Sequence, residues 1–379
     1  MENRALFCTT AQFEQLLDLI KNDGYKLLGP TIRDDTIIYD ELRSAKDLPI
    51  GWKDEQDPGR YRLKRRNDSA YFGYNLGPHS WKKYLFPPKE KLWTINKQEN
   101  NKLAILQEVE PVEEKMAFIG VRACEMQAIF VLDKVFNTKV AVYQQYQRRR
   151  ENTFIMAVNC TTAANTCFCA SMQSGPAVKE GYDLSLTEVV DENQHYFILK
   201  IGSERGESIC KALQFSIASS EESGLAHTHV ERTIDKMIRK VDNDHVHEVL
   251  AESWDSKQWD KVAERCINCA NCTMACPTCF CSDTQDVVSI DAKHVDRWQS
   301  WESCFNLSHS YIHGGSIRSS AKSRYRQWLT HKFGTWWDQF GVSGCVGCGR
   351  CITWCPVGID VTEELKQLQI EYNAKERDR

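Results

Sequence analysis

Cysteines are concentrated in the C-terminal third of the chain, where the stretch CINCANCTMACPTCFC alone holds six of them. Closely spaced thiols can ligate metals or take part in redox chemistry. Two arrays fit the pattern C-x2-C-x2-C-x3-C-P, and they comprise Cys266, Cys269, Cys272 and Cys276, then Cys345, Cys348, Cys351 and Cys355. Proteins with two iron–sulfur clusters use this run, in which three neighbouring thiolates hold one cluster and the fourth cysteine crosses to the other.

The spacing within each array has a geometric cause. Two residues between ligands let the backbone wrap around a cluster with its amide groups facing the sulfides, and the proline then ends the loop. The crossing rule predicts two ligand sets, which are Cys266, Cys269, Cys272 and Cys355 for the first cluster and Cys345, Cys348, Cys351 and Cys276 for the second. Each array therefore needs the other to complete its cluster.

Zinc and a redox dithiol are the rival interpretations of these arrays. Zinc sites normally use two spaced pairs of ligands, and they lack the crossing C-P pair. The interval between the arrays is much longer than in compact bacterial ferredoxins, and it contains helix-like stretches such as SAKSRYRQWLTHKFGTWWDQF. We therefore predict an α-helical, ferredoxin-like dicluster domain with an insertion.

Three further cysteines lie close to the first array, at Cys279, Cys281 and Cys304. Three thiolates could support a further or partial cluster, but a fourth ligand is not evident in the sequence. Free cysteine also packs well as a small hydrophobic side chain. We expect these three residues to pack near the clusters, and ligation is the alternative.

A third group of cysteines lies in the N-terminal half. The stretch KMAFIGVRACEMQAIFVLDKVF predicts a buried strand at Met116–Val121 followed by a helix, with Cys124 at the join. A second apolar strand, TFIMAVNC, ends at Cys160, and Cys167 and Cys169 follow. If the strands are parallel neighbours, Cys124 and Cys160 emerge at the carboxyl ends, where open α/β sheets bind ligands. Spacing alone leaves open whether these are ligands or buried core thiols.

The overall composition limits the classes of protein to which the chain can belong. The 379 residues are 42% hydrophobic and 26% charged, which is typical of a globular chain with two or three domains. No apolar stretch is long enough for a membrane span, and the N-terminus resembles no signal segment. We therefore expect a cytoplasmic protein, in which a reducing environment favours metal ligation over disulfides for the seventeen cysteines. Their odd number excludes complete pairing within the chain.

Charge gives little reason to expect a nucleic-acid partner, because the formal net charge is −4. Basic runs at 60–67, 147–150 and 318–326 are interpreted as solvated faces, with a docking patch or a positive field around an anionic cofactor as the alternative. The sequence contains neither G-x-G-x-x-G after a strand nor G-x-x-x-x-G-K-[ST], so we predict no flavin or NAD site in this chain. Substrate chemistry is expected on another polypeptide.

Several segments together resemble a known family. GVRACEMQAIFVLDKVF, NCTTAANTCFCASMQSGP, CPTCFCSD and HKFGTWWDQFGVSGCVGCGRCITWCPVGID are similar to the iron–sulfur β subunit of cytosolic NiFe-hydrogenases of the sulfhydrogenase type, and to the related A subunit of anaerobic sulfite reductase. The resemblance spans roughly residues 80–365 and is specific because unrelated cysteine patterns recur in order. It implies that the ligands of a third 4Fe-4S cluster are Cys124, Cys160, Cys167 and Cys169. Ala123 and the stretch TTAAN replace prolines usual in the family, which loosens a turn without removing a ligand.

The segment pattern and the resemblance together predict the architecture and the function. We expect an α/β domain at 1–240 with one 4Fe-4S cluster, and a helical ferredoxin-like domain at 241–379 with two. The chain would relay single electrons between a flavoprotein subunit that reacts with NAD(P)H and the small and large subunits of a NiFe-hydrogenase, with no catalytic residue of its own. In the sulfite reductase alternative, it would feed a sirohaem subunit. Alternatives of other classes are a cluster-containing nucleic-acid-binding or sensor protein and a structural zinc protein.

Overall fold

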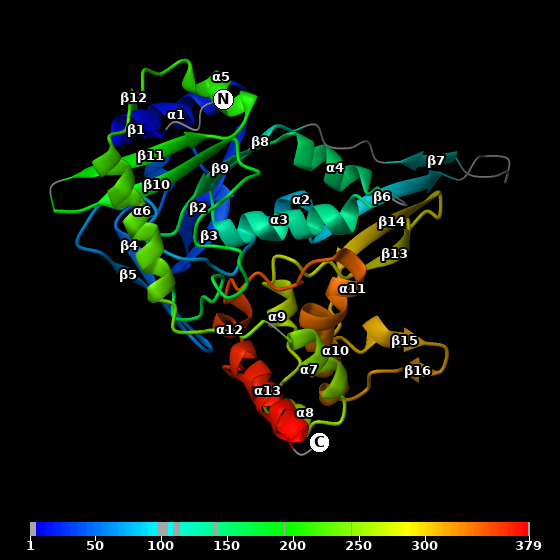
Figure 1. Cartoon of the computed structure of the whole chain (residues 1–379). Coiled ribbons are helices and arrows are strands. Elements are labelled where there is room, and N and C mark those ends of the chain that lie inside the picture. The colour runs from blue at the N-terminus through cyan, green and yellow to red at the C-terminus, as the bar shows by residue number, and fades with distance from the viewer. Residues whose placement is uncertain are drawn as a thin grey trace.

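The chain folds into an α/β part that carries the N-terminus and a second part, made mainly of helices, that ends at the C-terminus (Figure 1). The structure is a computed structural model, and it describes residues 5–96, 105–108, 114–138, 142–192, 194–243 and 245–377. A mixed α/β chain with a C-terminal cysteine-rich part is what the sequence predicts.

The α/β part is organised around an eight-stranded mixed sheet. Its strands are Leu6–Thr9 (β1), Lys26–Arg33 (β2), Thr36–Glu41 (β3), Met116–Val121 (β8), Thr153–Val158 (β9), Leu184–Val190 (β10), His195–Ile201 (β11) and Ser216–Ile217 (β12). Their spatial order is β12-β1-β11-β10-β9-β8-β2-β3. The four strands β10, β9, β8 and β2 run parallel, and the outer strands pair antiparallel. Every residue of β8 and β9 is buried, as is typical of parallel strands covered on both faces.

Helices cover both faces of this sheet. Neighbouring strand residues point to opposite faces, so Phe154 and Ile155 belong to different cores. On the face of Phe154 lie α1 (Thr10–Asn22) and α5 (Glu204–Cys210). On the other face lie α3 (Ala123–Phe136) and α6 (Ser220–Asp235), with the short helices α2 (Lys82–Leu85) and α4 (Gln144–Glu151) beside α3.

The strand–helix–strand unit predicted around Cys124 is confirmed. β8 has the predicted bounds, and α3 begins immediately after it at Ala123. β9 lies parallel to β8, with Ala117 opposite Phe154. The carboxyl ends of the two strands therefore lie at the same edge of the sheet.

The C-terminal part packs short helices around a second core. Its helices are α7 (Val246–Glu252), α8 (Gln258–Arg265), α9 (Asn271–Met274), α10 (Ala321–Thr330), α11 (Trp336–Phe340), α12 (Arg350–Thr353) and α13 (Val361–Arg377), with the π-helical turn η3 (His331–Thr335) between α10 and α11. Trp259, Trp328 and Leu365 lie in the core that these helices enclose. The helical stretch predicted at 320–340 is thus confirmed.

The helical description of this part is incomplete, because its insertion also contains hairpins. The longer one is β13 (Ser282–Val288) with β14 (His294–Trp301), and the shorter is β15 (Tyr311–Ile312) with β16 (Gly315–Ser316), which follows the 3-10 turn η2 (Ser308–Ser310). β14 pairs with β6 (Lys89–Asn96), which pairs with β7 (Ile105–Glu108), so one sheet joins segments from both sides of residue 240 (Figure 1). The sequence does not reveal β13, since all its residues are exposed and no apolar alternation marks it.

A further hairpin connects the two parts. It consists of β4 (Trp52–Asp57) and β5 (Arg60–Arg65), and it lies after the 3-10 turn η1 (Ala45–Asp47). At its tip the Gly59 N–H donates to the carbonyl of Ile352 at 3.1 Å. Thr353 donates its hydroxyl to Gln56 Oε1 at 2.8 Å. The α/β part is thereby bonded directly to the loop of the second cysteine array.

Candidate metal centres

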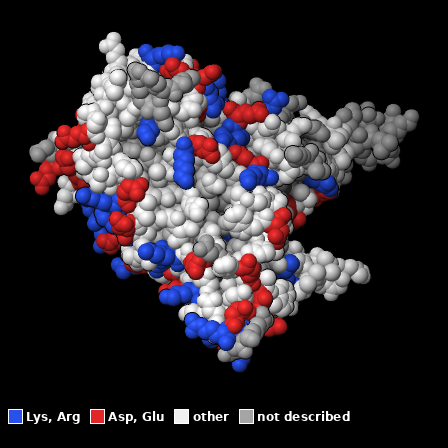
Figure 2. Space-filling view, viewed as in Figure 1, with Lys and Arg blue, Asp and Glu red and all other residues white. Residues whose placement is uncertain are grey.

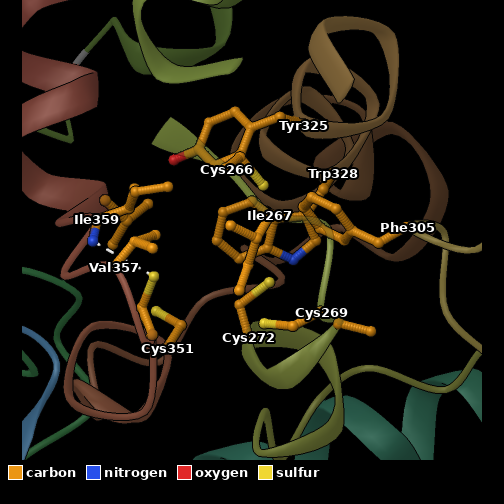
Figure 3. Close-up of a pocket in the computed structure, with 13 residues that line it drawn as sticks. Cys266, Ile267, Cys269, Cys272, Phe305, Tyr325, Trp328, Cys351, Val357 and Ile359 are labelled. Atoms are coloured by element: carbon orange, nitrogen blue, oxygen red, sulfur yellow. Dashed lines mark hydrogen bonds between the residues drawn. The ribbon is translucent and has the colours of Figure 1, made fainter. Parts of the chain in front are cut away.

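The first cysteine array begins in the loop between α8 and α9, which holds Cys266 and Cys269, and continues with Cys272 in α9 and Cys276 after it. Asn268 and Ala270 have φ angles of 56° and 65°, and this left-handed backbone turns the chain sharply between successive cysteines. Figure 3 shows the side chains of Cys266, Cys269 and Cys272 around one pocket. The array therefore presents its first three thiols to a common space, as the spacing predicts.

Residues from far along the chain complete this pocket. Cys355 lies on its wall, and its Sγ accepts a hydrogen bond from the Ile359 N–H at 3.3 Å. Aromatic side chains of Phe305, Tyr325 and Trp328 form an apolar wall (Figure 3). The structure thus brings Cys355 to the first array, in agreement with the predicted crossing. Cys351 also lines the pocket, so the first and second sites are close neighbours.

The second array wraps in the same way, with left-handed glycines at Gly347 (φ 61°) and Gly349 (φ 75°). The Gly347 N–H donates to the Sγ of Cys345 at 3.4 Å. Burial, with repulsion from Cys348 and Cys276 as smaller causes, raises the pKa of Cys345 to about 12. Cys276, contributed by the first array, is therefore within electrostatic range of the second array, as the crossing rule requires.

The third group of thiols lies where the sheet predicts it. Cys124 is 5% exposed at the start of α3. Burial raises its pKa well above the usual range, and the charges of Cys169, Cys348 and Cys160 raise it further. Burial and then the charge of Cys160 raise the pKa of Cys167 to about 12. The four N-terminal cysteines therefore lie together, and Cys348 of the second array joins them.

Close backbone contact explains why the N-terminal group lies against the second array. The Phe168 N–H donates to the carbonyl of Gly347 at 2.9 Å, and the Ser174 hydroxyl donates to the carbonyl of Val346 at 2.6 Å. A Cβ atom on Gly347 would lie 2.7 Å from the backbone of Cys169, a separation that side chains do not tolerate. Glycine is therefore required here for a close approach as well as for its left-handed φ angle.

A buried ion pair also joins the two parts, and sequence reasoning missed it. Arg350 and Glu125 are each 1% exposed, and Arg350 Nη2 lies 2.5 Å from Glu125 Oε1. Arg350 also donates to the carbonyls of Gly77 at 3.0 Å and His79 at 2.7 Å. Each partner directly adjoins a cysteine in the chain, Cys124 in one case and Cys351 in the other. A charged residue at such a position is the signal that could have identified the pair.

Cys279, Cys281 and Cys304 lie together beside the first two sites. Burial and the charge of Cys281 raise the pKa of Cys304 to about 12. Cys304 in turn is the strongest charged neighbour of the Cys272 thiol. The expected packing against the helical core holds for Cys304. Two lysines that the sequence did not single out, Lys82 and Lys332, face this group.

The chemistry of these residues fits iron–sulfur clusters. Each of the three predicted sites offers four thiols, which are soft ligands suited to iron–sulfur clusters. Backbone N–H groups already point at the sulfur atoms of Cys345 and Cys355. In the part of the chain that the structure describes, no group of three or more His, Cys, Asp or Glu side chains is arranged to hold a single metal ion.

Some of the cations in the basic runs pair with neighbouring carboxylates. Lys64 pairs with Glu55 at 2.7 Å, and Lys322 pairs with Asp260 at 2.9 Å. Arg149, in the run at 147–150, is 8% exposed and pairs with Glu90. Figure 2 shows basic and acidic side chains interspersed over the visible face. Lys64 is half exposed, whereas Arg149 and Arg324 are buried, so the interpretation of the runs as solvated faces holds for only some of their residues.

Comparison with known proteins supports the predicted resemblance. Residues 265–359 match the family described as 4Fe-4S dicluster domain. The chain is 29% identical over 360 residues to the Sulfhydrogenase 2 subunit beta of Pyrococcus furiosus, and the match covers 94% of this chain and 96% of that protein. The similarity to a sulfhydrogenase β subunit, predicted from the cysteine segments, is therefore confirmed. No solved structure matches the chain. Within the described residues, the helices are too short or too polar to cross a membrane.

Proposed function

We propose that the chain is the electron-relay subunit of a multisubunit cytosolic NiFe-hydrogenase of the sulfhydrogenase type. It would connect a flavoprotein subunit that reacts with NAD(P)H to the small and large hydrogenase subunits. The observation that carries this proposal is the adjacency of three thiol groups. The N–H of Phe168, between Cys167 and Cys169, donates to the carbonyl of Gly347 in the second array, and Cys351 of the second array lines the pocket of the first site. The N-terminal, second and first sites therefore form a continuous row, which is the arrangement that a relay requires.

Twelve cysteines are assigned as ligands in this proposal. The first site has Cys266, Cys269, Cys272 and Cys355, the second has Cys276, Cys345, Cys348 and Cys351, and the N-terminal site has Cys124, Cys160, Cys167 and Cys169. A 4Fe-4S cluster, when bound, accepts and donates one electron at a time, with a potential set by its protein surroundings. Similarity to the Pyrococcus β subunit along almost the whole chain supports the type of complex.

The other residues at these sites would set the reduction potentials of the bound clusters. Amide hydrogen bonds to the sulfur atoms of Cys345 and Cys355 withdraw electron density from the ligands, which favours the reduced state. The aromatic wall that contains Phe305 and Trp328 shields one side of the first site from water. Lys332 Nζ donates to Cys276 Sγ at 3.5 Å, and this positive charge stabilises added negative charge at the second site.

The first site is the one that a partner could approach most closely. Cys269 is an exposed thiol, and Ile267 beside it is 60% exposed. By contrast, Cys124 and Cys169 of the N-terminal site are buried. The proposal therefore places entry or exit of electrons at the surface around Cys269, with the flavoprotein and the hydrogenase subunits as the two partners of the relay.

The test compares two reactions of the anaerobically purified complex. NAD(P)H-driven hydrogen evolution needs the whole relay, whereas a reduced viologen can donate directly to the hydrogenase subunits. Cys272→Ala should lower the first reaction by at least about tenfold and leave the second within about twofold of wild type. Cys8→Ala, which replaces a buried thiol of the α/β core, should change neither. Equal loss of both reactions, or purification with a sirohaem subunit in place of the hydrogenase subunits, would contradict the proposal.

A further inference from the structure

Three of the five cysteines outside the predicted ligand sets, Cys279, Cys281 and Cys304, are brought together by the hairpin β13–β14. Ser282 at the start of β13 pairs with Trp301 at the end of β14. Beyond this pair, the Glu302 N–H donates to the carbonyl of Cys281 at 2.9 Å. Cys281 and Cys304 therefore lie at the same end of the hairpin, although 22 residues separate them along the chain. Cys279 precedes Cys281 by two residues and completes the group.

This group borders both predicted C-terminal sites. Thr273, in the first array, shares a hydrogen bond of 2.8 Å with Ser303, the residue next to Cys304. Cys276 of the second ligand set shares a hydrogen bond of 3.2 Å with Thr278, the residue next to Cys279. The three thiols are thus held by the same loops that shape the first two sites, and each is only partly accessible to solvent.

Two buried lysines face the three thiols. Lys82 and Lys332 are 3% and 4% exposed. Lys332 Nζ donates to Thr278 Oγ1 at 2.9 Å and to the carbonyl of Gly344 at 3.1 Å, in addition to its contact with Cys276. It lies in the π-helical turn η3, an irregularity that often marks functional sites. Two ammonium groups are therefore buried a short distance from a cluster of cysteines.

The lysines are oriented by thiols and by neutral groups. Lys82 Nζ donates to the carbonyl of Cys279 at 2.9 Å and lies 3.9 Å from the ring centre of Trp301. Burial lowers the pKa of Lys82 to about 8, and the charges of Cys279 and Cys276 oppose this shift. Buried charges are stable only when opposite charge compensates them. Lys332 contacts Cys276 of the second ligand set, so the second site already supplies negative charge to it. Neutral thiols at Cys279, Cys281 and Cys304 would not compensate the Lys82 cation, whereas metal-bound thiolates would.

We propose that Cys279, Cys281 and Cys304 bind a fourth iron–sulfur cluster, whose negative charge is balanced by Lys82 and Lys332. This inference rests on the proposed function, because it extends a relay of three clusters by one. Three thiolates leave one iron for a ligand other than cysteine. The additional cluster would lie beside both the first and the second site, at the end of the hairpin β13–β14. It would therefore form a side branch of the relay.

Metal and sulfide analysis of the full-length chain, purified anaerobically without its partners, tests this site. Wild type should contain about sixteen irons and sixteen acid-labile sulfides, and Cys281→Ala and Cys304→Ala should each lower both counts to about twelve. These residues flank opposite strands of the hairpin, so the same loss from either variant identifies a shared site. Cys210→Ala, a buried thiol in the α/β core, should retain the wild-type counts.

Spectroscopy of the reduced protein supplies the second measurement. After full reduction, the integrated paramagnetic signal of either hairpin variant should decrease by about one spin per chain relative to wild type. About twelve irons in wild type and in both variants would overturn the fourth cluster alone and leave the three-cluster relay intact. Loss of one zinc per chain, with iron unchanged, would also overturn it. Wild-type protein without iron and sulfide would refute the proposed function itself.

Discussion

Removing the positive partner of the buried Glu125–Arg350 pair should destabilise the junction between the two parts of the chain. In Arg350→Met, the Glu125 carboxylate stays buried and keeps its hydrogen bonds from the Tyr39 hydroxyl at 2.7 Å and the Trp81 ring N–H at 3.1 Å. Leaving one charge of a buried pair uncompensated costs about 3–5 kcal/mol. At about 2.1 cal/mol/K per residue, a chain of 379 residues has an unfolding entropy of about 0.8 kcal/mol/K, so Tm should fall by about 4–6 °C.

Anaerobic thermal unfolding, followed by circular dichroism, measures this change. The double variant Glu125→Gln with Arg350→Met removes the stranded charge and should recover about half of the lost Tm, because the carbonyls of Gly77 and His79 remain without their donor. Arg297→Met is the matched control. Arg297 pairs with Asp286 on the exposed hairpin, where the cost should stay below about 1 kcal/mol. A Tm for Arg350→Met within 1–2 °C of this control would refute the reasoning.

Three further predictions concern the thiol sites. Cys124→Ala should lose about four irons per chain and spare the C-terminal ones, and unchanged iron in anaerobic metal analysis would show that Cys124 is not a ligand. Lys332→Met should lower the midpoint potential of the second site by on the order of 100 mV in a redox titration, whereas exposed Lys322→Met should leave it unchanged. Gly347→Ala should lower Tm more than Gly314→Ala. Both glycines have positive φ angles, but only at Gly347 would the added Cβ atom collide with neighbouring atoms. Equal shifts in Tm would mean that the close contact at Gly347 contributes little stability.

Local features of the site could be predicted from the sequence because their causes are local. The C-x2-C spacing requires a tight loop, and the left-handed residues Asn268 and Gly347 provide it within a few residues of the ligands. The apolar run Met116–Val121 has to be covered on both faces, which predicts a buried parallel strand. Since β9 follows the same rule, the convergence of Cys124 and Cys160 at one sheet edge was also predictable.

Long-range contacts were decided only by the tertiary structure. The pairing of Glu125 with Arg350 joins residues 225 positions apart, and no periodic pattern encodes it. The strand β13 is exposed throughout and shows no apolar alternation, so its role in gathering Cys281 and Cys304 follows from pairing with β14.

The sequence by itself thus determined which cysteines share a loop and which strands are buried, because ligand spacing and apolar runs act over a few residues. The tertiary structure decided which of the sites lie side by side and which cations face them. It placed Cys348 beside Cys124 and directed the cations Lys82 and Lys332 toward Cys279, Cys281 and Cys304. The physical reason is that burial of charge and close backbone approach depend on groups distant in sequence, which only the folded chain brings together.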